Sequence, residues 1–443
     1  MTMNPSGAPA QEPSSAGAQP ASPPNEALTG DTLPEVGAVY IWLMVFAQFG
    51  VFVAFITPLA ISLSIRVDQL APGHEEYLGY ITGSGALAVM VAGPVLGVLS
   101  DRARTRLGRR RPFMIAGMVL GTASLCVMAL APDIVLLGAG WILAQLGWGQ
   151  VLGNLQFSTA DRLPESQRGK VSGLTGFATQ VAPVLGVALA GQLTRDNLLL
   201  FLVPGAIGIV LVTLFVVFVH EDDTRGATFP EALTPGSLLR KYLYDPRTYP
   251  DYSWNWLGRF LFYFGLTLNT TFTAFFFASR MGVSVDEAAG VIAGISLFGV
   301  VATTVGAIGG GFLSDRLRRR RVFVFGAGAL FAAGAIVMAV SADLPLLIVG
   351  AALTSVGIGA FAAVDQALLL DVLPERETDA GRFMSITGFA TSIPQAVAPL
   401  IAPAFLAVGA GATGEKNYAL LYTVAAVCTL AGGLATTRIR SVR

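Results

Sequence analysis

The sequence GVLSDR at residues 97–102 recurs as GFLSDR at residues 311–316. Each copy ends an apolar run, and each is followed within a few residues by a cluster of arginines. A duplicated charged loop inside a very apolar chain is typical of membrane carriers built from two similar halves. The chain is therefore predicted to contain two related bundles of membrane-spanning helices.

Two further pairs of matching segments support the duplication. DRLPE at residues 161–165 matches DVLPE at 371–375, and TGFAT at 175–179 recurs at 387–391. The matches occur in the same order in both halves, which chance similarity in an alanine- and glycine-rich chain does not readily produce.

The composition predicts that most of the surface faces lipid. Only 13% of the 443 residues are charged, 53% are hydrophobic and the mean hydropathy is +0.65, whereas soluble domains carry about 25% charged residues. A spanning helix needs roughly 20 mainly apolar residues. Twelve such windows are found: 38–65, 77–99, 113–131, 134–158, 171–192, 198–219, 254–277, 288–313, 322–340, 344–369, 381–406 and 418–436.

The basic residues predict the orientation of these spans. Of the 28 lysines and arginines, only Arg66, Arg195, Arg280 and Lys416 fall in loops on one side. Basic residues near the ends of spans remain cytoplasmic. We therefore expect a multi-pass protein of the cytoplasmic (inner or plasma) membrane, with both termini in the cytoplasm.

The chain divides into five predicted parts. The first part is rich in Pro, Ser, Ala and Gly, so we expect it to be disordered. The connector holds a short amphipathic stretch at Leu238–Leu243, which favours a small helix along the membrane surface. The parts are a cytoplasmic tail (1–36), a six-helix bundle (37–220), a cytoplasmic connector (221–251), a second six-helix bundle (252–436) and a cytoplasmic C-terminal tail (437–443).

Small residues precede each repeated loop at every fourth position, on one helix face. Such a face lets a neighbouring helix approach closely. The two rows are Gly93, Gly97 and Asp101, and Ala307, Gly311 and Asp315.

The acid at the end of each row suggests a gate. We hypothesise that Asp101 and Asp315 hold the cytoplasmic side closed in the outward-open state, by facing helix N-termini of the opposite half. Such a contact stabilises by roughly 0.3–1 kcal/mol. Arg102 and Arg316 would strengthen the gate through acids at the ends of the fourth and tenth spans. The alternative is that these loops, including Arg109–Arg111 and Arg318–Arg321, only fix orientation by their charge.

The repeated loop and the twelve spans resemble the major facilitator superfamily. The resemblance covers nearly the whole chain after the tail. The longer loop SDRARTRLGRRRPF at residues 100–113 is similar to that of the sucrose-type sugar–proton symporters and related glycoside–cation symporters. It implies a transporter that works by alternating access.

Amide side chains within the spans are candidates for substrate binding. Carriers of this kind bind near the midplane between the halves, and amides both donate and accept hydrogen bonds, which suits hydroxyl-rich ligands. The alternative role for each is helix packing. The main candidates are Gln48, Gln145, Asn154, Gln156, Asn269 and Gln366, and further polar candidates within the spans are Gln150, Thr270, Thr271 and Gln395.

Asp365 is the one acid clearly within a predicted span, so it is the candidate for proton coupling. The competing interpretation is an ion pair with an arginine such as Arg382 or Arg316. Arg259, near the start of the seventh span, is expected to act as a gate or to snorkel to the interface.

One departure from the plant sucrose carriers puts sucrose itself in doubt. Those carriers have an acid and an arginine in the fourth span, linked to proton coupling and sugar binding. The matching positions here are Gln145 and Gln156.

The sequence therefore predicts a secondary active transporter for a neutral polar solute, with a sugar or glycoside as the expected class, driven by protons or sodium. The alternative is a proton-coupled exporter of apolar, drug-like compounds, supported by APVLG at 182–186, which partly resembles an antiporter motif. A third alternative is a membrane sensor or scaffold, but the sequence shows no soluble output domain that would serve it. No catalytic, metal-binding or phosphate-binding motif stands out, so we expect no enzyme activity, cofactor or bound metal. The expected partners are solute, ion and membrane lipid but no nucleic acid, and we expect a monomer.

Overall fold

The computed structural model describes residues 34–221, 223–226, 244–341, 343–375, 380–409 and 416–442. Most of the predicted N-terminal tail and the predicted connector helix at Leu238–Leu243 lie outside the described residues.

The first half begins with a long span that changes its helical pitch midway. Its helix continues through a π-helical turn that starts at Pro58, where the missing backbone N–H interrupts the regular bonding. The elements are α1 (Ala38–Thr57), η2 (Pro58–Ser62), α2 (Leu63–Leu70), α3 (Glu76–Asp101), α4 (Arg111–Leu130), α5 (Ile134–Arg162), α6 (Glu165–Gly191) and α7 (Asn197–Phe218).

The second half repeats this plan. Its first span is broken, because α9 and α10 meet at a bend of 47°. The elements are α9 (Pro250–Thr271), α10 (Thr273–Met281), α11 (Val285–Leu317), α12 (Arg320–Val340), α13 (Leu344–Val372), α14 (Ala380–Ala407) and α15 (Tyr418–Thr436).

The predicted all-helical membrane fold is confirmed. By length and composition, 11 helices of the described chain could cross a membrane, or 12 if α9 and α10 form one span. The described residues contain no strand. Each predicted window coincides with a helix to within a few residues.

Four helices of the described chain begin at a capping Asp or Asn side chain, which accepts hydrogen bonds from the first unpaired N–H groups. Asp133 and Asp343 cap α5 and α13, while Asp196 and Asn417 cap α7 and α15. These caps occupy matching places in the two halves. They explain why the short gap at Asp133 is a true break between spans.

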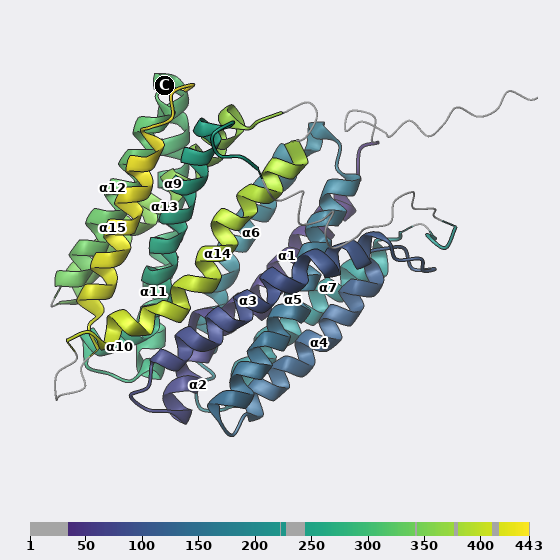
Figure 1. The fold of residues 1–443 in the computed structure, drawn as a ribbon. Helices are drawn as coiled ribbons and strands as arrows, with labels where there is room; N and C mark the ends of the chain where they lie inside the picture. The colour runs from purple at the N-terminus through teal and green to yellow at the C-terminus, as the bar shows by residue number, and fades with distance from the viewer. Residues whose placement is uncertain are drawn as a thin grey trace, which may run out of the picture.

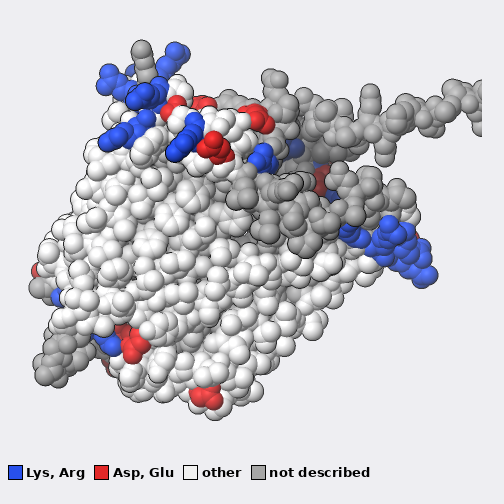
Figure 2. Space-filling view, in the orientation of Figure 1, with Lys and Arg blue, Asp and Glu red and all other residues white. Residues whose placement is uncertain are grey.

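The two halves touch at one end and separate toward the other (Figure 1). We call the end that carries Arg102–Arg111 and Arg316–Arg321 the arginine-rich end, and the opposite end the far end. Figure 2 shows charged side chains gathered near the arginine-rich end, above a broad uncharged surface that suits lipid.

At the far end, α3 of the first half packs directly on α14 of the second half. A Cβ atom at Gly79 would lie 2.3 Å from the carbonyl oxygen of Pro399, and one at Gly83 would lie 2.5 Å from Cγ of Leu400. These two positions therefore require glycine for the halves to meet as closely as they do.

Candidate functional site

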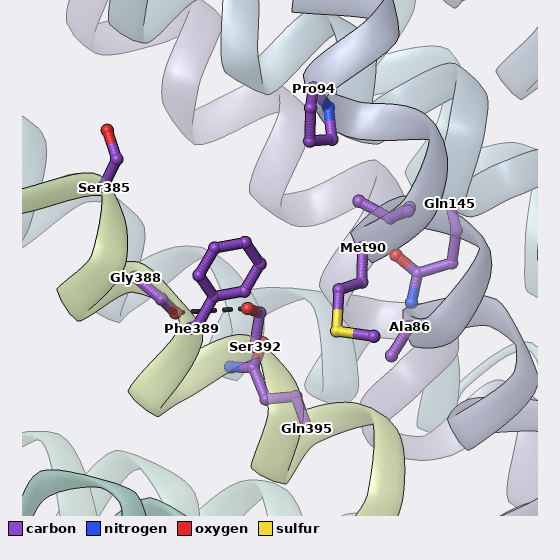
Figure 3. Close-up of a pocket in the computed structure, with 10 residues that line it drawn as sticks. Ala86, Met90, Pro94, Gln145, Ser385, Gly388, Phe389, Ser392 and Gln395 are labelled. Atoms are coloured by element: carbon purple, nitrogen blue, oxygen red, sulfur yellow. Dashed lines mark hydrogen bonds between the residues drawn. The ribbon is translucent and has the colours of Figure 1, made fainter. Parts of the chain in front are cut away.

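A cleft opens between α3 and α14 where their close contact ends. Its volume is about 350 Å³, and we call it the central cleft. It is lined by Ala86, Val89, Met90, Pro94 and Gln145 from the first half and by Ser385, Gly388, Phe389, Ser392 and Gln395 from the second (Figure 3).

The lining of the central cleft is polar but uncharged. Its polar groups are two amides, Gln145 and Gln395, and two hydroxyls. Neither amide bonds to another described residue, so both keep donors and acceptors available, whereas Ser392 Oγ donates to the carbonyl of Gly388 at 3.1 Å. Met90 and Phe389 add apolar surface between these groups (Figure 3). Such a lining suits a neutral ligand with several hydroxyls and an apolar face.

A buried ion pair lies within the second half, between α9 and α13. Arg259 Nε is 2.6 Å from Asp365 Oδ2, and Asp365 has no solvent-accessible surface. Asn255 Nδ2 donates to Asp365 Oδ1 at 3.1 Å, and Arg259 Nη2 donates to Gln366 Oε1 at 3.1 Å. The arginine thus joins the buried carboxylate to the exposed amide of Gln366.

This pair corrects two interpretations of the sequence. The arginine that meets Asp365 is Arg259, whereas Arg382 and Arg316 were the suggested partners. The side chain of Arg259 is only 12% exposed and is paired with Asp365, which favours a place inside the bundle over snorkelling to the interface. The acid holds the guanidinium within the bundle because an unpaired charge there would be costly.

A second charged cluster lies at the arginine-rich end of the first half. Arg110 Nη1 is 2.6 Å from Asp101 Oδ1, and Arg110 Nε is 3.3 Å from Asp161 Oδ2. Arg109 also reaches Asp161, at 2.8 Å. The guanidinium of Arg110 lies 4.7 Å above the ring of Phe157 and is almost fully buried.

The second half repeats this cluster with different residues around it. Arg320 Nη2 is 3.0 Å from Asp315 Oδ1, and Arg320 Nη1 is 2.5 Å from Asp371 Oδ2. Arg320 also donates to the carbonyl of Ala367, whose position matches Phe157 in the repeat. Both gate acids therefore pair with an arginine of their own half in this conformation.

The predicted gate differs from this arrangement in its arginines. The acids Asp161 and Asp371 were expected to meet Arg102 and Arg316, and the structure pairs them with Arg110 and Arg320. These two arginines were assigned to membrane orientation alone. Both directly follow the loop and are brought back to the acid by the start of the next helix.

The small-residue rows were expected to lie against a neighbouring helix. A Cβ at Gly93 would meet nothing within 4 Å, and one at Gly97 would meet only Phe157, at 4.0 Å. At Gly311 the nearest atom is 3.8 Å away, on Ala363. No residue of the opposite half lies within 4 Å of these three positions, because the halves are apart at this end.

The predicted substrate-binding amides are scattered rather than gathered. Of the six main candidates Gln145 alone lines the central cleft, where the further candidate Gln395 joins it, and Gln366 contacts Arg259. Asn154 is fully buried and accepts a hydrogen bond from Ser100 Oγ at 2.6 Å, so it does not reach the cleft.

The remaining three amides also lie outside the residues that line the cleft. Gln48 and Asn269 are buried within their halves, and Asn269 Nδ2 has no partner among the described residues. Gln156 is exposed. The sequence search had no means to separate amides facing the cleft from amides facing a neighbouring helix.

The sequence of the repeats agrees with a known family. The sequence model of the Major Facilitator Superfamily matches residues 37–310 and 296–442. The chain belongs to this superfamily. It is accordingly a multi-pass membrane transporter and not an enzyme, as its sequence predicted.

Individual relatives are more distant. A general alpha-glucoside permease of Schizosaccharomyces pombe is 28% identical over 222 residues. That match covers 43% of this chain and only 39% of the permease, so the chain spans about two fifths of the relative's length.

Solved structures share the fold. A nucleoside transporter, NupG, matches with a TM-score of 0.69 at 11% identity over 91% of this chain and 99% of NupG. A D-xylose–proton symporter matches with a TM-score of 0.67 at 14% identity, over 91% of this chain and 98% of the symporter.

Proposed function

We propose that this protein imports a neutral, hydroxyl-rich solute, a sugar or glycoside, together with a proton, by alternating access and as a monomer. The observation that carries the proposal is an uncharged, amide-lined cleft between the halves together with a buried carboxylate–arginine pair in one half. The printed name of the yeast relative, an alpha-glucoside permease, supports the solute class.

The proposed orientation follows from the basic residues. With the arginine-rich end in the cytoplasm, the positive-inside rule is satisfied. The described conformation, closed at the far end and open at the arginine-rich end, is then the inward-open state. The membrane is the cytoplasmic membrane.

Solute binding is assigned to Gln145 and Gln395, which approach the central cleft from opposite halves. A solute that bonds to both amides draws the halves together, which favours closure around it. Ser392 adds a hydroxyl, and Phe389 offers a flat face for a sugar ring.

Proton coupling is assigned to Asp365. When the carboxylate is ionised it holds Arg259, and Arg259 in turn holds Gln366. Protonation removes the charge that fixes the guanidinium and thereby releases Gln366. Asn255 can satisfy both forms, because its buried Oδ1 has no partner among the described residues and the amide can turn to accept the acid proton.

The gate is assigned to Gly97, Asp101, Arg102, Gly311, Asp315 and Arg316. In the outward-open state the opposite half would pack on the small-residue rows, whose glycines have no residue of that half within 4 Å here. The aspartates would then lie at helix N-termini of the opposite half.

Transport into proteoliposomes tests the proposal. Empty vesicles receive an inward proton gradient, an inward sodium gradient or neither, and a panel of labelled sugars and glycosides is supplied outside. We expect accumulation of one class under the proton gradient, with alkalinisation of the external medium. Accumulation driven by sodium alone contradicts proton coupling, and efflux of apolar dyes without sugar uptake favours the exporter.

Cleft variants locate the binding site within the same assay. Gln145→Ala and Gln395→Ala each remove one hydrogen-bonding group, and we expect each to raise KM by about ten-fold. Gln192→Ala is the matched control, because Gln192 is exposed and lies outside the cleft. Unchanged KM in both cleft variants contradicts this site.

A further inference from the structure

The far end carries a cluster of ionisable side chains that joins the two halves. Lys416 Nζ, just before α15, is 2.8 Å from Glu76 Oε2 at the start of α3. Next to this pair, the hydroxyl of Tyr418 donates to the carboxylate of Glu75. Both contacts connect one half to the other, so both must break when the far end opens.

Glu75 is surrounded by both acidic and basic side chains. Asp68 on α2 and Glu76 on α3 are the acids that face it, and Lys416 is the cation. His74 pairs with Glu76 at 2.8 Å, so it faces the neighbouring carboxylate. Asp286 on α11 interacts electrostatically with Asp68 and not with Glu75 directly.

Burial has the largest effect on the pKa of the Glu75 carboxyl. Loss of solvent raises the pKa of its carboxyl from an ordinary 4.5 to about 7, against the attraction of Lys416 and with the help of Asp68. Lys416 and Tyr418 come from the other half of the protein, so they are part of this environment only while the far end is closed.

We propose that Glu75 is a second proton-binding site, distinct from Asp365, which takes up an external proton as the far end closes and so favours the inward-open state in acid. This goes beyond the proposed transport cycle, because it needs neither the solute nor the coupling site. Only the side of the membrane from which the proton comes rests on the proposed orientation.

The direction of the pH effect follows from the surroundings of Glu75 in the closed and open forms. When the halves separate at the far end, Glu75 leaves Tyr418 and returns to water, where its pKa falls back toward its ordinary value. The closed form therefore binds the proton more tightly, and acid shifts the population toward it. Between about pH 7.5 and pH 5.5 the ratio of closed to open forms should rise by about 20-fold.

Spin-label distances at the far end test this. Labels are placed at Pro132→Cys in the first half and Val408→Cys in the second, both exposed positions, with Cys126 and Cys428 replaced by Ser. The full chain is studied in lipid nanodiscs without solute, in an Asp365→Asn background, so that the coupling acid does not contribute. We expect the short-distance population to grow as pH falls, with the growth beginning near pH 7.

Two variants in the same background make the result specific. Glu75→Gln imitates the protonated acid and should give mostly short distances at every pH. Asp68→Asn removes a repulsive charge, so the response should persist but begin at a lower pH. A pH-independent parent, or a Glu75→Gln variant that titrates like the parent, overturns the proposal. If Glu75→Gln fails to fold, a response in Asp68→Asn that begins at the same pH as in the parent overturns it alone.

The outcome is separable from that of the transport proposal. If the spin-label distances change with pH and this change is lost in Glu75→Gln, the proton site at Glu75 is supported even if no sugar accumulates in vesicles. Proton-driven uptake with pH-independent distances leaves the transport proposal intact and contradicts the proton site at Glu75.

Discussion

The two halves share their charged clusters at the arginine-rich end but differ in their interiors. Asp101, Arg110 and Asp161 of the first half correspond to Asp315, Arg320 and Asp371 of the second. The position that matches Asp365, however, is Leu155, a fully buried apolar residue. Features present in both halves suit a motion that both halves perform, whereas a charge present in one half suits a task performed once per cycle.

The largest effect is expected from making the second half resemble the first. Arg259→Leu leaves Asp365 as an uncompensated buried acid and should cost about 3–5 kcal/mol of stability. The double variant Arg259→Leu with Asp365→Leu removes both charges and should recover most of that loss. Thermal unfolding in detergent measures both, and equal losses in the single and double variants would contradict a buried pair.

The shared clusters should differ in strength because their arginines differ in exposure. The Arg110 side chain is 5% exposed and that of Arg320 is 26% exposed. Arg110→Gln should therefore cost about 2–4 kcal/mol, and Arg320→Gln about 1 kcal/mol or less. The same unfolding assay compares them, and a larger loss in Arg320→Gln would show that burial does not govern these clusters.

Opposite ends of α3 should respond in opposite directions to added bulk. Gly83→Ala places a Cβ against Leu400, and overpacking of this kind costs about 1–3 kcal/mol, so the inward-open state should lose population. Gly97→Ala meets only Phe157, at 4.0 Å, and should disfavour the other state, in which the row is covered. Far-end spin-label distances read both shifts, and shifts in the same direction would contradict a rocking motion.

The smallest effect concerns the matched caps. Asp133→Ala and Asp343→Ala should each cost about 1 kcal/mol, while the Asn variants, which can also cap, should be nearly neutral. Thermal unfolding separates them. A loss in the Asn variants equal to that in the Ala variants would point to a role for the charge.

The spans were predictable because hydropathy is a property of long segments. The predicted window 134–158 begins at the first residue of α5, and α5 continues only a few residues further, to Arg162. Asp365 was also accessible from sequence, since an acid within an apolar run is rare enough to stand out. Its partner was not, because Arg259 lies in another span and the pairing depends on how α9 packs on α13.

The ion pairs at the arginine-rich end could not be predicted from the sequence, for a different reason. Arg110 follows Asp101 by nine residues, whereas Arg320 follows Asp315 by only five, so no common spacing marked them. The central cleft was similarly hidden. Gln395 was one of several polar residues within the spans, and only the packing of α14 near α3 distinguishes it from the others and adds Ser392.

The central claim, that Asp365 couples solute to protons while the duplicated parts perform the motion, is tested most directly in one pair of variants. Proton-driven accumulation and solute exchange at equal pH are measured in vesicles containing Asp365→Asn, with Asp133→Asn as the matched control. The account predicts that Asp365→Asn loses accumulation by ten-fold or more but retains exchange, and that Asp133→Asn retains both. Accumulation in Asp365→Asn at the level of the unmodified protein would contradict it.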